Sequence, residues 1–115
     1  MGTILEEPRL DVLFTALSDR TRRDIVVRLS ERDATVKELA ERYAMTMQAV
    51  SQHIGVLERS GLIGRGRHRQ TRPCHLEPAA LDIAASWIEE SRRTWTERMD
   101  RLEARLAHLQ QDDAQ

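Results

Sequence analysis

The sequence is short of the residues that build several common kinds of protein. It has a single cysteine, Cys74, which excludes an intramolecular disulfide. Its aromatic residues are two Trp, one Tyr and one Phe, so Leu, Ile, Val, Ala and Met must supply most of a core. No apolar run approaches the ~20 residues that cross a bilayer, and no basic start followed by a long apolar segment resembles a secretory signal. These absences predict a cytoplasmic protein with no membrane partner.

Charge is nearly balanced overall but unevenly distributed. The net charge is −1, and Lys37 is the only lysine. Residues 61–76 contain no acid and carry four arginines, which are Arg65, Arg67, Arg69 and Arg72. Residues 77–115 carry nine acids against five arginines. Because a local basic patch attracts phosphate whatever the total charge, the near-neutral balance does not exclude a nucleic-acid partner.

The first part of the chain is predicted to be a tail followed by two helices. With 115 residues, 40% of them hydrophobic, the chain is long enough for one packed domain. Residues 1–9 are expected to form an N-terminal tail closed by Pro8, and residues 10–110 the domain. Leu10, Leu13 and Phe14 have helical spacing. A second helix over residues 19–30 would have Ser18 as its N-cap.

Residues 35–60 predict two capped helices joined by a tight turn. Thr35 and Glu38 form the Thr-x-x-Glu pattern of a capping box. After a break at residues 44–45, Thr46 is the expected N-cap of a helix over residues 47–60, and Gly61 ends it. Two short extended segments, 62–65 and 71–76, would pair as a hairpin that carries the four arginines of residues 61–76. The fold is therefore predicted as mainly α with a small β-hairpin (α+β), a winged helix-turn-helix with its wing over residues 61–76, which makes double-stranded DNA the expected partner.

Residues 78–110 predict a long final helix, followed by a C-terminal tail over residues 111–115. Its apolar residues recur every seven positions at Leu81, Ile88, Trp95, Leu102 and Leu109. Ala85, Met99 and Leu106 fill intervening positions. This period is typical of a helix that pairs with another chain, which predicts a homodimer. Packing on the protein's own first helix is the alternative, and both can hold along different parts of the helix.

The predicted DNA-contacting residues lie on the helix over 47–60, on its cap and on the wing. Gln48, Ser51 and Gln52 can address base edges, since Gln pairs with adenine and Ser with either base or phosphate. The remaining predicted contacts are Thr35, Thr46, Met47, His53, Arg65, Arg67, Arg69 and Arg72. Ser51 and Gln52 as ordinary surface, and Met47 as a residue packed on the preceding helix, are the alternatives. Eight arginine–phosphate contacts in a dimer imply a salt slope of roughly −7.

Two stretches resemble the ArsR-type winged-helix regulators. Residues 16–23, ALSDRTRR, resemble the family's "ALSDPTRR" opening, with Arg20 in place of proline. Residues 45–63 resemble its "S-x-x-A-V-S-x-H-L-x-V-L-x-x-A-G-L-V" core, with Gly55 in place of the commoner lysine. The resemblance implies a homodimeric transcriptional repressor that binds an inverted repeat, with a dimer interface made by the first and last helices. That interface is assigned to Leu10, Leu13, Phe14, Leu81, Ile88, Trp95, Met99, Leu102 and Leu106.

No metal or cofactor is predicted. The family's arsenic-type site uses a Cys-x-Cys pair in the helix before the reading helix, and residues 36–41 contain no cysteine. Its zinc-type site uses separated histidines on the last helix, where only His108 occurs. The last helix instead resembles a metal-free branch of the family, and the inducer is not implied. A metal- or thiol-responsive repressor using Cys74, His75 and His68 is kept as an alternative.

Rival functions have weaker support. We find no glycine-rich phosphate loop, metal triad or nucleophile elbow, so an enzyme is not expected. A dimeric interaction module that does not bind DNA is the second alternative, and it rests on the final helix alone.

Overall fold

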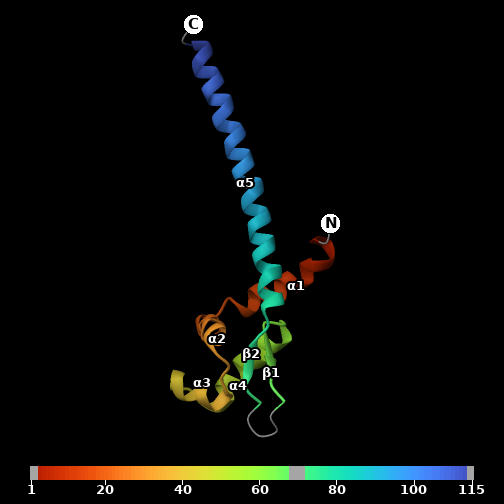
Figure 1. Ribbon diagram of the computed structural model, residues 1–115, viewed down its shortest axis with the longest axis vertical. Helices are drawn as coiled ribbons and strands as arrows, with labels where there is room; N and C mark the ends of the chain where they lie inside the picture. Colours follow the sequence, from red (N-terminus) through yellow and green to blue (C-terminus); the bar gives the residue numbers. More distant parts are fainter. Residues whose placement is uncertain (1–2, 68–71, 114–115) are drawn as a thin grey trace. The chain divides into compact units, whose positions relative to one another are not determined.

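A computed structural model describes residues 3–67 and 72–113 of the chain. Figure 1 shows the predicted order of helices with a small hairpin before the last helix. The elements are α1 (Thr3–Ala16), α2 (Arg20–Glu31), α3 (Val36–Tyr43), α4 (Met47–Arg59), β1 (Ile63–Arg65), β2 (Cys74–Leu76) and α5 (Pro78–Asp113). The predicted winged helix-turn-helix fold is confirmed. None of the described helices combines the length and the apolar character that crossing a lipid bilayer requires.

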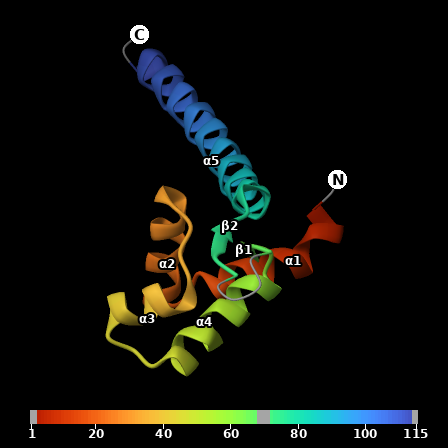
Figure 2. The same ribbon diagram turned by 60° about the horizontal axis from the view of Figure 1, so that its bottom comes forward.

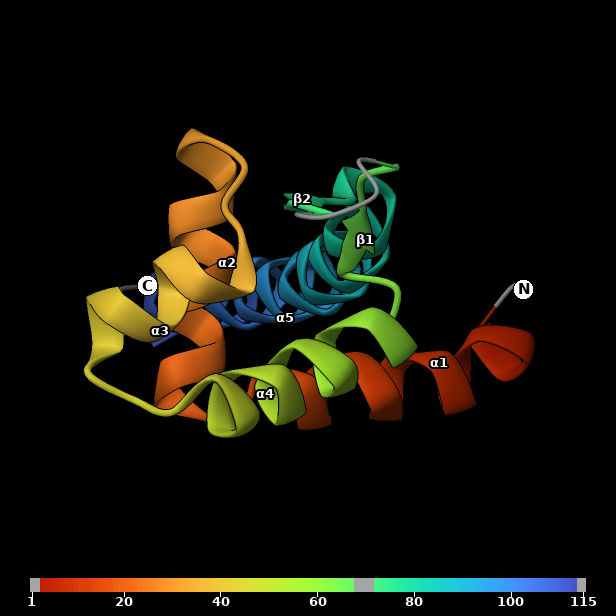
Figure 3. The ribbon, with the colours of Figure 1, turned by 90° about the horizontal axis from the view of Figure 1, so that it is seen from below.

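The chain divides into two compact units, Met1–Ala84 and Ala85–Gln115. The first unit contains the helix-turn-helix, the wing and the beginning of α5. The second consists of the rest of α5. Within the first unit, α4 runs beside α1 and packs on α3 and α2 (Figures 2 and 3). The core of this unit therefore surrounds the inner face of α4.

The core of the first unit is aliphatic, as the shortage of aromatic residues predicts. Leu13, Ile25, Leu57 and Leu62 are each 0% exposed. Ala80 and Ala84, at the start of α5, are buried in the same cluster. The other buried members of the cluster are Ala16, Val26, Leu29, Leu39, Ala40, Val50, Ile54, Ile63 and Cys74. Since α4 contributes Val50, Ile54 and Leu57, one side of that helix is fixed and the opposite side is free to face a partner.

The hairpin is short and is joined to the helical part by one extra bridge. β1 and β2 are antiparallel and pair Ile63 with Leu76, Gly64 with His75 and Arg65 with Cys74. Cys74 also exchanges backbone hydrogen bonds with Ala34. The Cys74 N–H donates to the Ala34 carbonyl at 2.7 Å, and the Ala34 N–H donates to the Cys74 carbonyl at 3.1 Å. This bridge holds the base of the wing against the segment between α2 and α3.

Three predicted boundaries were wrong. α1 begins at Thr3, so the expected tail over residues 1–9 is largely helical and Pro8 lies inside it. A proline near the start of a helix removes one backbone hydrogen bond, and its ring distorts only the short helical segment that precedes it. The N-cap of α2 is Asp19, whose carboxylate accepts from the Arg22 N–H at 3.0 Å, whereas the Ser18 hydroxyl donates to the Thr15 carbonyl. α5 continues to Asp113, through most of the expected tail over residues 111–115.

Candidate nucleic-acid interface

The exposed side of α4 carries the polar residues predicted to read DNA. Gln48, Ser51 and Gln52 are exposed, and Met47 at the helix start is 54% exposed. Met47 is therefore not packed on the preceding helix, which removes that alternative. Gln48 and Gln52 lie on the side opposite the buried residues of α4, Ser51 lies beside that side, and Met47 is exposed because it begins the helix. Side chains with amide and hydroxyl groups on a free helix face can form hydrogen bonds to base edges in a major groove.

Two caps and a left-handed turn position α4. The Thr35 hydroxyl accepts from the Glu38 N–H at 3.1 Å, and the Glu38 carboxylate accepts from the Thr35 N–H at 2.9 Å. The same Thr35 N–H lowers the pKa of Glu38 below its ordinary value. Ala44, with φ of 53°, ends α3, and the Thr46 hydroxyl accepts from the Ala49 N–H at 3.1 Å to begin α4. The hydroxyl oxygens of Thr35 and Thr46 therefore accept capping hydrogen bonds, and the contacts of these residues with DNA stay predictions.

His53 has two neighbours within the protein, Arg22 and Asp19. Its Nδ1 lies 3.3 Å from a guanidinium nitrogen of Arg22 and 3.9 Å from a carboxylate oxygen of Asp19. The His53 side chain is only 19% exposed. The His53 ring therefore joins α4 to the start of α2, and its contact with a phosphate stays a prediction.

Arg22 is a structural residue that the sequence analysis missed. Its Nε donates to the Ala16 carbonyl at 2.7 Å and its Nη2 to the Thr15 carbonyl at 3.2 Å. Arg22 therefore caps the C-terminal end of α1, where carbonyl groups lack helical partners, while it holds His53 of α4. The sequence feature that could have indicated this role is the place of Arg22 in the ALSDRTRR stretch. Its carbonyl acceptors lie six and seven residues away, however, which is farther than a local capping pattern extends.

The wing arginines fall into different environments. The Arg65 Nε donates to the Arg72 carbonyl at 2.8 Å, and a guanidinium nitrogen of Arg65 lies 3.6 Å from the Glu58 carboxylate. Its side chain is 18% exposed and has partners within the protein, and its predicted phosphate contact stays a prediction. Arg67 and Arg72 are exposed. The predicted contact of Arg69 lies outside the described residues.

Arg59 is a second residue that the sequence analysis missed. A side-chain atom built on Gly55 would meet a guanidinium nitrogen of Arg59 at 3.1 Å. The Arg59 side chain therefore folds back over Gly55, the position where a lysine is commoner in the resembling family. Arg59 is one helical turn after Gly55, and its guanidinium places a positive charge beside that position of α4.

Cys74 and His75 do not form a ligand pair. Cys74 is 0% exposed, and burial raises the pKa of its thiol, which disfavours the reactive thiolate. His75 Nε2 is hydrogen-bonded to the Glu77 carboxylate at 2.7 Å. Across residues 3–67 and 72–113, no three His, Cys, Asp or Glu side chains gather as a metal site would require. His68, the third residue of this alternative, lies outside the described residues.

The residues predicted to form a dimer interface divide between core and surface. Leu10 and Leu13 are 4% and 0% exposed, so they are occupied inside the protomer and are corrected to core residues. Leu81 packs against the same core, and Phe14 is 37% exposed. In the second unit the predicted residues are on the surface. These are Ile88, Trp95, Leu102 and Leu106, which are 49–59% exposed, and Met99, which is less exposed.

Comparison with known proteins places this geometry among transcriptional regulators. A family model described as a helix-turn-helix domain matches residues 17–64. The uncharacterized HTH-type transcriptional regulator YuzN of Bacillus subtilis is 37% identical over an alignment of 87 residues, and the match covers 69% of this chain and 95% of YuzN. The transcriptional repressor SdpR of the same organism is 29% identical over 76 residues, 66% of this chain and 84% of SdpR. The crystal structure of an ArsR family transcriptional regulator, RHA00566, matches with a TM-score of 0.71 at 35% identity, and covers 76% of this chain and 97% of that one.

Proposed function

The chain belongs to the ArsR family of winged helix-turn-helix, DNA-binding transcriptional regulators, and we propose that it is a homodimeric repressor of an inverted repeat near its own promoter. The observation that carries DNA reading is the exposed polar side of α4, whose other side is locked in the core. The family consists of regulators and not of enzymes. The proposed role implies a cytoplasmic protein, because the DNA that it binds lies there.

Base recognition is assigned to α4. Gln48 and Gln52 each offer a carboxamide that can pair with adenine N6 and N7, and Ser51 offers a hydroxyl one position earlier than Gln52. The first backbone N–H groups of α4 point out of the helix start, where they can meet a phosphate. Exposed Met47 can contact a thymine methyl group. The reading helix thus supplies sequence preference from its first two turns.

Backbone contacts are assigned to the wing and to the caps. Arg67 and Arg72 are exposed at the wing, and Arg69 is kept with them as a prediction. Arginine in this position follows the negative potential of a groove or of the phosphates. The hydroxyls of Thr35 and Thr46 stay in the proposed set, because a hydroxyl that accepts one hydrogen bond can still donate its own proton. These contacts would position the protein without choosing the sequence.

The second unit is proposed as the main dimer contact. Its Ile88, Trp95 and Leu102 keep the seven-residue period, Leu106 occupies an intervening position, and each of the four is about half-exposed. A second copy of the same helix matches this series by symmetry and would bury it. Two reading helices related by a two-fold axis would meet two half-sites in an inverted repeat. Repression is proposed from the name of SdpR, which is called a transcriptional repressor.

The test is a comparison of two variants on DNA from the gene's own promoter. Binding of a labelled duplex is measured by fluorescence anisotropy, against a scrambled duplex of the same composition. Gln52→Ala should reduce the difference between the two duplexes, because it removes a base contact. Arg67→Ala should weaken both duplexes alike, because it removes a phosphate contact.

Two results would count against the proposal. Equal weak binding of the wild-type protein to both duplexes at low and high salt would refute sequence-specific DNA binding. Loss of sequence preference in Arg67→Ala, with preference kept in Gln52→Ala, would reverse the two assignments. Transcription in a purified system decides the sign of regulation, since added protein should lower the transcript level of a repressed promoter.

A further inference from the structure

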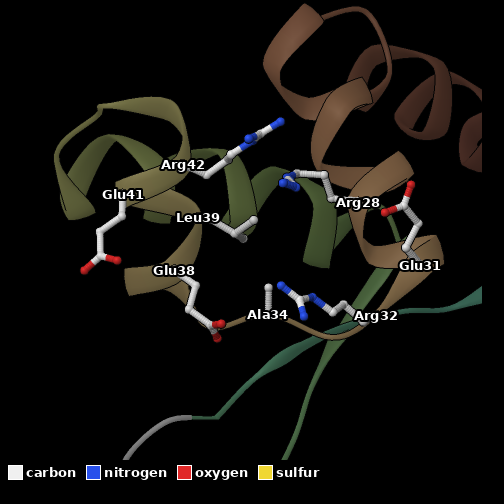
Figure 4. A pocket seen from close by; sticks show the side chains of 8 residues that line it. All are labelled: Arg28, Glu31, Arg32, Ala34, Glu38, Leu39, Glu41 and Arg42. Atoms are coloured by element: carbon white, nitrogen blue, oxygen red, sulfur yellow. The ribbon is translucent and has the colours of Figure 1, made fainter.

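A cleft between α2 and α3 is lined by three arginines and shares no residue with the proposed DNA surface. Its volume is about 410 Å³, which is within the range of small-molecule sites. Arg28 comes from the last turn of α2, Arg32 caps the end of that helix, and Arg42 comes from the last turn of α3. Leu39 and Ala34 supply its apolar surface (Figure 4).

The arginines of this cleft have no close carboxylate partner. Among the described residues, none of the three guanidinium groups forms an ion pair within 4.0 Å. Figure 4 shows Arg28 extending from α2 and Arg42 extending from α3, and both side chains line the cleft. Arg28 is half-buried, so its charge is less screened than that of a fully exposed arginine. Two guanidinium groups that line one cleft and have no ion-pair partner can receive a ligand's negative charge.

Of the three acids that line the cleft, Glu38 and Glu41 are directed elsewhere. Figure 4 shows the Glu41 carboxylate pointing away from Leu39. Glu38 is held by the α3 capping box, where its carboxylate accepts from the Thr35 N–H, and the charge of Arg32 helps to lower its pKa. Arg32 thus faces an acid of the protein itself. Arg28 and Arg42 are the two arginines that stay available.

We propose that the cleft binds a small molecule carrying at least two oxyanion groups, carboxylate or phosphate, held between Arg28 and Arg42. Each guanidinium can donate two parallel hydrogen bonds to one oxyanion, which gives both strength and a fixed orientation. The carbon skeleton of the ligand would lie against Leu39 and Ala34. A free oxyanion compound is favoured over a backbone phosphate of DNA, because the cleft lies beside α3 and includes none of the polar residues on the exposed side of α4.

Citrate is a suitable probe, since it has several carboxylates and a short aliphatic skeleton. The full chain is titrated at neutral pH and constant ionic strength, and two-dimensional NMR follows backbone amides and arginine Nε–H groups. Saturable shifts should appear at Leu39 and at the Nε–H groups of Arg28 and Arg42. Isothermal titration calorimetry should show at least tenfold weaker binding for the double variant Arg28→Gln, Arg42→Gln.

Arg20→Gln is the control for a general charge effect, because it removes one of the two positive charges that the double variant removes, from an exposed position of α2 outside the cleft. It should bind citrate within about twofold of the wild-type protein. Amide spectra of the variants, unchanged away from the cleft, show that they are folded. Shifts that do not saturate, shifts reproduced by chloride, or equal losses in Arg20→Gln and in the double variant would overturn the proposal.

A DNA titration separates the two sources of oxyanion. The double variant should bind promoter DNA within about twofold of the wild-type protein, since its two arginines are not assigned to DNA. A loss of DNA affinity as large as that of Arg67→Gln, in a protein that does not bind citrate, would overturn the proposal and assign the cleft to a DNA phosphate.

Discussion

The salt dependence of DNA binding distinguishes the arginines of the wing. Arg65 and Arg67 are two residues apart and would project to the same side of a regular strand, yet only Arg67 is exposed. Arg65 donates to the Arg72 carbonyl at 2.8 Å and lies 3.6 Å from the Glu58 carboxylate. Replacing each arginine by Gln removes one charge from the same short segment. The two variants therefore differ mainly in whether the lost charge was available to DNA.

The size of the effect follows from counterion release. Each phosphate neutralised by the protein contributes about −0.9 to the slope of log affinity against log salt. In the proposed dimer, each arginine position occurs twice and contributes about −1.8. Without Arg65, three arginine positions in each wing give a slope of about −5, instead of the roughly −7 expected for four. Arg67→Gln should reduce the size of the slope by about 1.8, and Arg65→Gln should leave it nearly unchanged.

The assay is an anisotropy titration of promoter DNA over a series of salt concentrations. Arg92→Gln is a suitable control, because Arg92 is a well-exposed arginine of α5. Its loss should not change the slope. Equal reductions in slope for Arg65→Gln and Arg67→Gln would refute the reasoning, since they would mean that Arg65 leaves its internal partners when DNA binds.

Three further predictions concern stability and assembly. Thr46→Ala should lower the free energy of unfolding by about 1 kcal/mol in chemical denaturation, because the Ala49 N–H loses its cap; no loss would mean that the cap is replaced. Asp19→Asn keeps a capping side chain but removes a carboxylate whose pKa is lowered, chiefly by the Arg22 N–H. Above about pH 4, the usual pKa of an Asp in an unfolded chain, the wild-type protein should be more stable than Asp19→Asn. This difference in the free energy of unfolding should vanish as the pH falls through the pKa of Asp19 in the folded protein, and a difference that stays constant down to low pH would contradict the prediction. Leu102→Glu should give monomers in analytical ultracentrifugation, whereas Ala104→Glu, two positions off the apolar series, should stay dimeric.

The features of this fold that the sequence predicts correctly are those that depend on residues within about four positions of one another. The Thr35–Glu38 capping box and the Thr46 cap were predicted and are present. Gly61 ends α4 as predicted, with φ of 84°, a conformation that glycine adopts without strain. Each signal joins residues on one helical turn, so spacing along the chain determines their geometry. The position of the reading helix could therefore be predicted from the sequence alone.

Other features depend on choices that local patterns leave open. Ser18 and Asp19 are adjacent and both can cap a helix, and the structure uses Asp19. Pro8 was expected to close a tail, but it lies in α1 with a short helical segment before it. Leu13 has the spacing of a helix face, but spacing does not say whether that face meets the protomer's own core or a second chain. These outcomes are decided by packing, which a linear pattern does not contain.

The arginines show why a charge pattern alone does not define a binding surface. Among the described residues, three arginines donate to backbone carbonyl groups, and one guanidinium can donate to several of them at once. Arg22 donates to the carbonyls of Thr15 and Ala16, Arg23 to that of Leu17 and Arg65 to that of Arg72. Two of these three act at the end of α1, where carbonyls lack helical partners. An arginine is thus available to a ligand only where no backbone acceptor or carboxylate lies within reach, and this condition depends on the folded chain.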